Sequence, residues 1–413
     1  MKKLLLLFLV STNCYSSTEN DEFFRLRLKN DFRNASRPSA GDGKDIYAWV
    51  QGIMLDYRTP QYSGWLSAEG GGYYIKRLDT KSNYVTRGYL KGNESFGIYY
   101  GAVNFSLKDN AHIKAGRFGT DTGYGSLPYD IPLISGGSTR TTPTLSEGVL
   151  GKYRVNDQVE LWGMWRYRVF NWSDVNTGVR HEGVYDYITG TYDRHEPRVF
   201  FAGIYDNNHT RFSLGASYQK DVSFQTKLNS RFTYVIDGNR RLKYEFLYFG
   251  ADLVGDSKHV SNHDSTNVFS SKVTYSLDKH SIYAAGGYVS HIIDNVGGNV
   301  DTDVGYVGAL SIDRNKENML SAQIGYSYSL NENLNMSIAP LYTKGYEDSS
   351  RNIPIEGRGV LLGMNYNINS GFAKGLQMFL YSDYARENRK NSSVGDNLEY
   401  WDVKAGFKYD FNF

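Results

Sequence analysis

The chain ends in the stretch Trp401-Asp-Val-Lys-Ala-Gly-Phe-Lys-Tyr-Asp-Phe-Asn-Phe413, in which apolar and polar side chains alternate. Every odd-numbered position in it, from Trp401 to Phe413, carries an apolar side chain. The even-numbered positions are charged or polar apart from Gly406. Successive side chains of a β-strand point to opposite faces, so this pattern predicts a strand with one apolar face and one wet face.

The apolar pattern runs to the last residue of the sequence, Phe413. A strand that ends in a terminal aromatic residue resembles the closing strand of a bacterial outer-membrane barrel. In that class of protein the terminal aromatic pattern is also the signal read by the barrel-assembly machinery. The resemblance therefore implies that this machinery is a partner, contacted through Phe413.

The amino-terminal residues have the composition of a secretory signal peptide. A short basic segment is followed by the apolar run Leu4–Val10, which is too short to span a bilayer. We expect residues 1–16 to be the signal peptide, with cleavage after Ser16. Residues 17–413 then form one transmembrane β-barrel domain, exported to the outer membrane of a Gram-negative bacterium.

The sequence contains one cysteine, Cys14, which leaves with the expected signal peptide. Asn13 precedes it where a bacterial lipoprotein has a small apolar residue, so the lipoprotein alternative is disfavoured. The mature chain has no disulfide under this interpretation. A closed barrel would hold such an exported chain together, because it pairs every backbone group.

Composition separates this chain from helical membrane proteins and from nucleic-acid-binding proteins. The mean hydropathy is −0.51, and no apolar run after the signal reaches the length of about 18 residues that a membrane helix needs. The chain has 35 Tyr, 21 Phe and 43 Gly but 8 Pro, which suits short transmembrane strands between aromatic girdles. The net charge of +2 is spread along the chain, so we expect no nucleic-acid partner.

The same alternation recurs along the chain in stretches of about ten residues, the length of a tilted membrane-spanning strand. Apolar residues take alternate positions over 320–330 and again over 334–342, with the polar turn 331–333 between them. Phe269–Leu277 and Ser281–Val289 predict a second hairpin of the same kind. Short polar turns of this type are expected on the periplasmic side of a barrel.

Three longer polar stretches, 174–196, 252–267 and 347–357, suit extracellular loops. A soluble β-sandwich or propeller is the alternative, but it needs a second sheet to cover the apolar face. It also leaves the signal and the terminal aromatic strand unexplained. At roughly 20–25 residues per strand and connection, the chain has room for about 16 to 20 strands around an aqueous lumen.

A more specific resemblance appears near the amino terminus. Phe24–Arg33 (FRLRLKNDFR) is followed by Ala48–Arg58 (AWVQGIMLDYR), with Trp49, Gln51 and Gly52 ahead of an Asp-Tyr pair. This order is similar to the opening of the OprD family of outer-membrane porins. In that family a strand with Arg-Asn is followed by one with Trp-Ala-Gln-Gly and Asp-Tyr.

The middle and the end of the chain resemble the same family. Ile113–Arg117 leads to Arg140, which lies three residues before Pro143 and eight before Gly148, as in the family's constriction loop. Thr141 and Thr142 stand where the family usually has two leucines. Near the carboxyl end, residues 371–376 (GFAKGL) match the family's Gly-x-x-Lys-Gly-Leu segment.

The resemblance implies an all-β fold, a closed antiparallel transmembrane β-barrel of eighteen strands. It also implies that a third extracellular loop, at about residues 119–147, folds inward and narrows the pore. On this loop the residues expected at the constriction or on the substrate path are Tyr129, Asp130 and Arg140.

The parity of each expected strand assigns cationic side chains to the lumen, because a charge on the lipid face costs about 2–4 kcal/mol at the bilayer midplane. These cations are Arg25, Arg27, Lys29, Lys114, Lys152, Arg154, Arg166 and Arg168. The OprD family is known for a basic ladder that guides carboxylates, so the resemblance implies a similar track here. The alternative is that these charges only hydrate the wall and pair with Asp or Glu.

We therefore predict an outer-membrane porin for passive diffusion of small hydrophilic solutes, with carboxylate-bearing amino acids and organic acids preferred. The alternative substrate is a chito-oligosaccharide, which would slide along stacked aromatic side chains. The candidates for that role are Tyr124, Tyr129, Trp162 and Phe170.

A barrel enzyme is a distant alternative, because none of the 8 histidines lies in a recognisable motif with a nucleophile. His259, His263 and Asp264 are close in sequence, but they lie in a Ser/Asn/Asp-rich stretch that is not a helix, so the metal interpretation is weak. We expect no cofactor. The expected partners are the solutes, outer-membrane lipid and lipopolysaccharide, and the protein is expected to be a monomer or a homotrimer.

Overall fold

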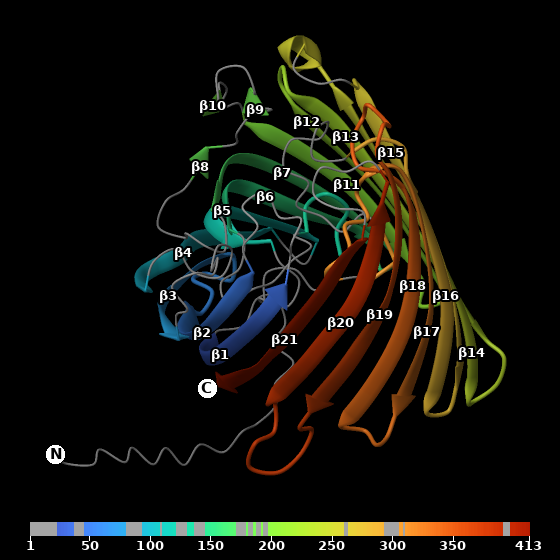
Figure 1. Ribbon diagram of the computed structural model, residues 1–413. Helices are drawn as coiled ribbons and strands as arrows, with labels where there is room; N and C mark the ends of the chain where they lie inside the picture. The colour runs from blue at the N-terminus through green and yellow to red at the C-terminus, as the bar shows by residue number, and fades with distance from the viewer. Residues whose placement is uncertain are drawn as a thin grey trace.

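The computed structural model describes residues 23–36, 45–79, 93–107, 110–120, 130–135, 145–170, 179–180, 185–186, 191–192, 197–259, 263–292, 305–308, 310–390 and 397–413. The expected signal peptide, residues 1–16, lies outside these residues and stays a prediction. Eighteen long strands dominate the described part of the chain (Figure 1). No helix in the described part is long and apolar enough to cross a membrane.

The eighteen strands are β1 (Phe23–Ser36), β2 (Ile46–Arg58), β3 (Leu66–Asp79), β4 (Glu94–Leu107), β5 (Ala111–Gly119), β6 (Leu145–Asn156), β7 (Val159–Phe170), β11 (Arg198–Asp206), β12 (Thr210–Gln219), β13 (Ser223–Val235), β14 (Arg240–Leu253), β15 (Ser265–Leu277), β16 (His280–Val289), β17 (Glu317–Ser329), β18 (Leu334–Tyr346), β19 (Pro354–Asn367), β20 (Gln377–Arg389) and β21 (Asn397–Asn412). The shorter elements are β8 (Val179–Arg180), β9 (Tyr185–Asp186), β10 (Thr191–Tyr192) and the 3-10 helix η1 (Gly255–His259).

The long strands form one closed ring. Each pairs antiparallel with the next, β7 pairs with β11, and β21 returns to pair with β1. At this seam the register runs from Arg25 opposite Asn412 to Ser36 opposite Trp401, and the backbone N–H of Phe413 donates to the carbonyl of Phe24 at 2.9 Å. In Figure 1 the dark red β21 accordingly lies beside the blue β1. The predicted closed antiparallel barrel is confirmed, and the number of strands is eighteen.

The outer face of the ring is apolar, as the alternation predicts. Ile53, Leu55, Leu161, Trp165 and Ile324 are exposed, with 42–60% of their surface accessible. Their neighbours in sequence are buried inside the ring, Met54 and Trp162 among them. An apolar band of this extent would be unstable in water, so it identifies the lipid-facing surface of a membrane barrel.

The connections differ in length at the two ends of the barrel. At one end the turns are short: β15 ends at Leu277 and β16 begins at His280, while β17 and β18 are joined by residues 330–333. Both predicted hairpins are present, with His280 inside a strand. By the rule for outer-membrane barrels, this end is periplasmic and the end with long connections is extracellular. Both ends of the described chain, Phe23 and Phe413, lie at the periplasmic end.

Two of the predicted loops are shorter than the sequence suggested. The stretch 252–267 contains the last residues of β14 and the first of β15, so the connection is 254–264. The stretch 347–357 is shortened to 347–353, because β19 begins at Pro354. Polar residues occur on both faces of these strand ends, with Thr266 buried but Asp252 exposed, and composition alone does not distinguish them from loop residues.

The wet face of the terminal strands is an ion-paired interior. Asp402 of β21 is fully buried, and it accepts hydrogen bonds from Arg33 of β1, with Nε 3.0 Å from Oδ2. Arg27 forms a two-pronged contact with Asp410, with its Nε at 2.6 Å from Oδ1 and its Nη2 at 2.8 Å from Oδ2. These pairs join the first and last strands from the inside, across the seam that closes the ring.

Replacing Asp402 by Leu should destabilise the barrel by about 3–5 kcal/mol, because it leaves the buried Arg33 guanidinium without its seam carboxylate. The measurement is the temperature at which the folded band converts to the unfolded band in a heat-modifiability gel. Replacing both partners, as Arg33→Met with Asp402→Leu, should recover most of the loss. A double variant as unstable as the single one would contradict the pairing.

Candidate functional site

A segment between β5 and β6 folds into the barrel. Residues 130–135 belong to the connection that the sequence predicts as the constriction loop, and Ile131, Leu133 and Ile134 are at most 4% exposed. These three side chains belong to one apolar cluster with wall residues such as Phe200 and Phe249. The described segment is therefore packed against the inner wall, as expected for an inward-folded loop.

Residues 130–135 pack closely against β12 because that strand has a glycine, Gly215, at the contact. A Cβ at position 215 would lie 2.7 Å from both the Cβ and the carbonyl oxygen of Pro132, closer than real Cβ contacts. Gly215 therefore lets the backbone of Pro132 approach the wall. β12 lies three strands beyond β6 in the ring, so the segment covers the inner faces of several strands.

Polar contacts fix the same segment to the next strand. The side chain of Asp130 lies 3.4 Å from Lys227 Nζ and 3.3 Å from Asn229 Nδ2, both on β13. Arg211 Nη2 donates to the backbone carbonyl of Asp130 at 2.9 Å. Asp130, predicted on the substrate path, is thus an anchor of the loop, with about half of its side chain exposed.

A second segment also folds inward, and the sequence analysis did not anticipate it. Residues 310 and 311 belong to the long connection between β16 and β17, and their backbone N–H groups donate to Asp383 Oδ2 of β20 at 2.9 and 2.8 Å. Gly308 exchanges two 2.8 Å hydrogen bonds with the Gln323 side chain of β17. No sequence signal marks Asp383 or Gln323 for this role, because polar residues are expected on the inner face anyway.

The two inward segments approach each other near Tyr306. Tyr306 packs against the apolar cluster that contains Ile131 and Phe200. Burial raises the pKa of the Tyr306 hydroxyl, and the charges of Glu245 and Asp130 raise it further. Two inward segments, and not the predicted constriction loop alone, are therefore attached to the inner wall among the described residues.

Four cations line the inner wall beside these segments. Lys152 of β6, Arg166 of β7, Arg198 of β11 and Lys227 of β13 are each at most 8% exposed. Arg166 and Arg198 are directly opposite each other in the β7–β11 register, and the Phe200 ring lies 4.8 and 5.6 Å from their guanidinium carbons. The structure thus brings the predicted Lys152 and Arg166 together with two cations that the sequence analysis missed.

Arg198 and Lys227 were missed for different reasons. On β11 both faces are apolar, with Phe200 and Ala202 on one side and Phe201 on the other, so parity does not say which face is the lumen. On β13 the polar residues do not alternate cleanly with apolar ones. Their luminal position follows from pairing with neighbouring strands, which the sequence does not specify.

Two further cations lie in the periplasmic half of the lumen and remain accessible. The side chain of Arg154, near the end of β6, is 45% exposed and lies 3.8 Å from Glu160. Arg231 of β13 is 43% exposed and lies 3.7 Å from Asp206. Arg154 was predicted to face the lumen. Glu160, which pairs with Arg154 across β6 and β7, also lies 3.2 Å from Lys152 Nζ.

Arg168 does not lie on the same face as Arg166, contrary to the parity prediction. A β-bulge between Glu147 and Gly148 shifts the β6–β7 register, so that Arg166 pairs with Gly148 but Arg168 pairs with Glu147. Arg168 Nη1 lies 3.3 Å from Glu147 Oε2, and Arg117 lies 3.8 Å from the same oxygen. One inserted residue reverses the alternation, so Arg168 lies on the face opposite to that of Arg166.

The other predicted cations are luminal but ion-paired. Arg25 lies 2.6 Å from the buried Asp56, and Lys114 lies 2.7 Å from Glu69. Arg27 is fully buried against Asp410. For this part of the wall the structure supports the alternative interpretation, in which luminal charges pair with Asp and Glu.

Several residues of the predicted site fall outside the described residues. These are Tyr124, Tyr129 and Arg140, together with the side chain of Phe170. Trp162, the remaining aromatic candidate for a sugar path, is 5% exposed, with Lys152 Nζ 5.2 Å from its ring centroid.

Replacing Gly215 by Ala should lower the single-channel conductance. The new Cβ would collide with Pro132, and overpacking of this kind costs about 1–3 kcal/mol. The hydrogen-bonded strand is fixed, so the loop segment must move toward the pore axis. Planar-bilayer recording measures this effect. Gly203→Ala on β11 is the matched control, since its Cβ would meet only Leu161 Cδ2 at 3.6 Å. Unchanged conductance in Gly215→Ala, or an equal fall in the control, would contradict the packing.

Comparison with known proteins gives relatives at two levels. No family model matches the chain. The membrane-associated protein UidC of Escherichia coli strain K12 is 46% identical over 402 residues, which cover 97% of this chain and 95% of that protein.

Solved structures share the fold at low sequence identity. OccAB3 of Acinetobacter baumannii superposes with a TM-score of 0.78 at 13% identity, covering 95% of this chain and 100% of that one. OccK9 (OpdG) of Pseudomonas aeruginosa gives 0.76 at 16% identity, covering 95% and 99%. OprD of Pseudomonas aeruginosa gives 0.69 at 17% identity, covering 97% and 100%. The chain therefore belongs to the same family as the membrane-associated protein UidC, and it has the fold of the OprD and Occ outer-membrane porins.

Proposed function

We propose that this outer-membrane porin admits small hydrophilic solutes by passive diffusion and favours those that carry a carboxylate. The observation that carries the proposal is the grouping of luminal cations on neighbouring strands, from Arg166 and Arg198 past Lys227 to Arg154 and Arg231. Fixed charges of one sign along a narrowed pore select solutes by charge and raise their local concentration.

The two sets of cations have different roles in this proposal. Lys152 and Lys227 are nearly buried and lie next to Glu160 and Asp130, so they shape the wall and contribute a background field. Arg154 and Arg231 are more than 40% exposed and lie only 3.7–3.8 Å from their nearest carboxylates. Long, exposed ion pairs of this kind contribute little to stability, so these two guanidinium groups remain available to a passing carboxylate.

Among the described residues, the aromatic side chains that pack with the loop segment 130–135 give no support to a chito-oligosaccharide path. A sugar that slides along stacked rings needs ring faces that are open to the lumen. Trp162 and Phe200 are at most 5% exposed and belong to the apolar cluster that holds the loop segment 130–135. The fold of the relatives is that of channels, which supports transport over the barrel-enzyme alternative.

Some partners expected from the sequence stay predictions. Contact with outer-membrane lipid follows from the exposed apolar band, and the fold implies passage of small solutes. The barrel-assembly machinery, lipopolysaccharide and the choice between monomer and homotrimer stay predictions. Phe413 is placed at the seam, where its ring centroid lies 5.4 Å from that of Phe24.

The proposed preference is measured by liposome swelling with pairs of solutes matched in size, one neutral and one carboxylate-bearing. Wild-type protein should admit the carboxylate faster. The double variant Arg154→Gln with Arg231→Gln should reduce the ratio of rates about two- to fivefold, since a charge pair at 4 Å in water is worth about 1 kcal/mol. Salt of about 1 M should weaken the preference of the wild type, because the Debye length falls to about 3 Å.

The matched control is Arg168→Gln, which removes one Arg of similar exposure from the opposite face of β7. It should leave the ratio of rates unchanged. Equal rates for neutral and carboxylate-bearing solutes in the wild type would remove the proposal. Blockage of the pore by chito-oligosaccharides alone would favour the sugar porin instead.

A further inference from the structure

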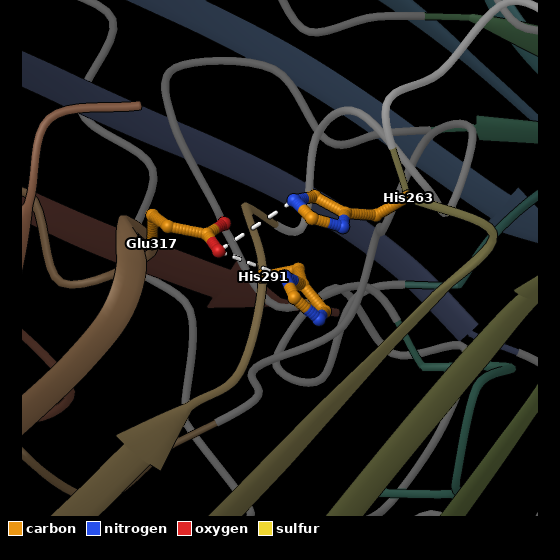
Figure 2. A group of neighbouring side chains, drawn as sticks. All are labelled: His263, His291 and Glu317. Carbon is orange, nitrogen blue, oxygen red and sulfur yellow. Dashed lines mark hydrogen bonds and ion pairs between the residues drawn. The ribbon is translucent and has the colours of Figure 1, made fainter. Parts of the chain in front are cut away.

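Two histidines and a glutamate meet at the extracellular end of the barrel, away from the luminal cations. His263 belongs to the connection before β15, His291 follows the end of β16, and Glu317 is the first residue of β17. Figure 2 shows the Glu317 carboxylate facing both imidazole rings. The three residues are far apart in sequence, and the antiparallel order β15–β16–β17 brings the ends of their strands together.

The ligand atoms of these residues are close enough to bind one ion. Glu317 Oε1 lies 2.9 Å from His291 Nδ1 and 3.6 Å from His263 Nε2. When one ligand atom is taken from each of the three residues, all three atoms lie within 4.8 Å of one another. Zinc takes nitrogen and oxygen ligands at about 2.0–2.2 Å, so ligands of a tetrahedral site are about 3.3–3.5 Å apart. The observed separations require only small side-chain rotations to reach this geometry.

The environment of the Glu317 carboxylate favours a bound cation. Glu317 is fully buried, and among the described residues its Oε2 atom has no hydrogen-bond partner. A buried carboxylate is costly unless its charge and its lone pairs are compensated. The two imidazole rings are stacked, with ring centroids 3.7 Å apart and an interplanar angle of 23°, so both lie beside the same carboxylate.

The Arg351 guanidinium competes with a metal ion for Glu317, and Asn318 is a second partner for it. Arg351, in the connection between β18 and β19, places Nη2 3.1 Å from Glu317 Oε1. With its amide turned over, Asn318 accepts from Arg351 Nε and Nη2 at 3.0 and 2.9 Å, and its nitrogen donates to Tyr288 and Ser290. In this orientation Arg351 keeps two hydrogen bonds when Glu317 binds a metal.

We propose that His263, His291 and Glu317 bind one divalent transition-metal ion, for which zinc is the best fit, with water completing the shell. Two imidazoles and one carboxylate with open positions form a common zinc ligand set. The ion links the connection 254–264 to both ends of the connection 290–316, because His291 and Glu317 bracket that connection. Its C-terminal part is the segment held inside the barrel by Asp383.

The test uses full-length mature protein, refolded in detergent without a histidine tag and stripped of metal with a chelator. Titration with zinc chloride, followed by calorimetry and by metal analysis after desalting, should give one zinc per chain. His263→Ala, His291→Ala and Glu317→Gln should each weaken binding about tenfold or more. Each variant is first checked for heat-modifiable migration, and the two His variants keep the test valid if Glu317→Gln fails to fold.

Two further variants separate a built site from nonspecific binding. His209→Ala removes an exposed histidine from the short turn before β12 and should bind zinc like the wild type. Arg351→Gln removes the competing cation and should bind zinc more tightly, and a purely structural ion pair gives no such gain. Absence of zinc binding, or binding unchanged in both His variants, would overturn the proposal. The result does not depend on the solute, so it is independent of the carboxylate preference.

Discussion

The backbone of a membrane-spanning strand has no water to pair with, and this requirement governs the whole structure. In a bilayer every N–H and C=O must find a partner within the protein, so a sheet that spans it must close. The β1–β21 ladder does this over twelve residue pairs, from Arg25–Asn412 to Ser36–Trp401. Once the ring is closed, the parity of each strand is fixed, with one face in lipid and the other in the lumen. The charges of the seam strands then have to lie inside, where Arg33 and Asp402 meet.

A ring of eighteen strands is too wide to be filled by its own side chains, and two inward segments of the chain pack against its inner wall. Each segment has its own attachment. Residues 130–135 use apolar packing, the close approach at Gly215 and the contacts of Asp130, whereas residues 310–311 use the carboxylate of Asp383. The apolar cluster that contains Phe200 and Phe249 is covered by residues 131–134. The accessible luminal side chains in the periplasmic half include Arg154 and Arg231.

The barrel could be predicted from the sequence because its governing pattern has a period of two, which a reader can count from Trp401 to Phe413. The resemblance to OprD added the strand number, which residue counting left at about 16 to 20. Parity assigned Lys152, Arg154 and Arg166 to one face, and in the structure they share the inner face of β6 and β7. It failed at Arg168, because a β-bulge inserts one residue and nothing in the local sequence marks it. It was silent on Arg198, because both faces of β11 are apolar.

Contacts between distant loops were the part that sequence reasoning could not supply. His263 was considered with His259, its neighbour in sequence, but the partners that the fold provides are His291 and Glu317. The inward attachment of residues 310–311 was missed for the same reason, since Asp383 lies more than seventy positions further along the chain. Such contacts depend on which strands are adjacent in the ring, and strand order is a property of the closed sheet.

The central claim is that the barrel is an open pore whose narrowed lumen carries a cationic wall. Its most direct test is the reversal potential of single channels in a planar bilayer under an about tenfold gradient of potassium chloride. Fixed positive charge attracts chloride and repels potassium, so the account predicts stable ohmic channels whose reversal potential has the sign of chloride selectivity. Refolded, heat-modifiable protein that gives no conductance, or channels that select potassium, would contradict it.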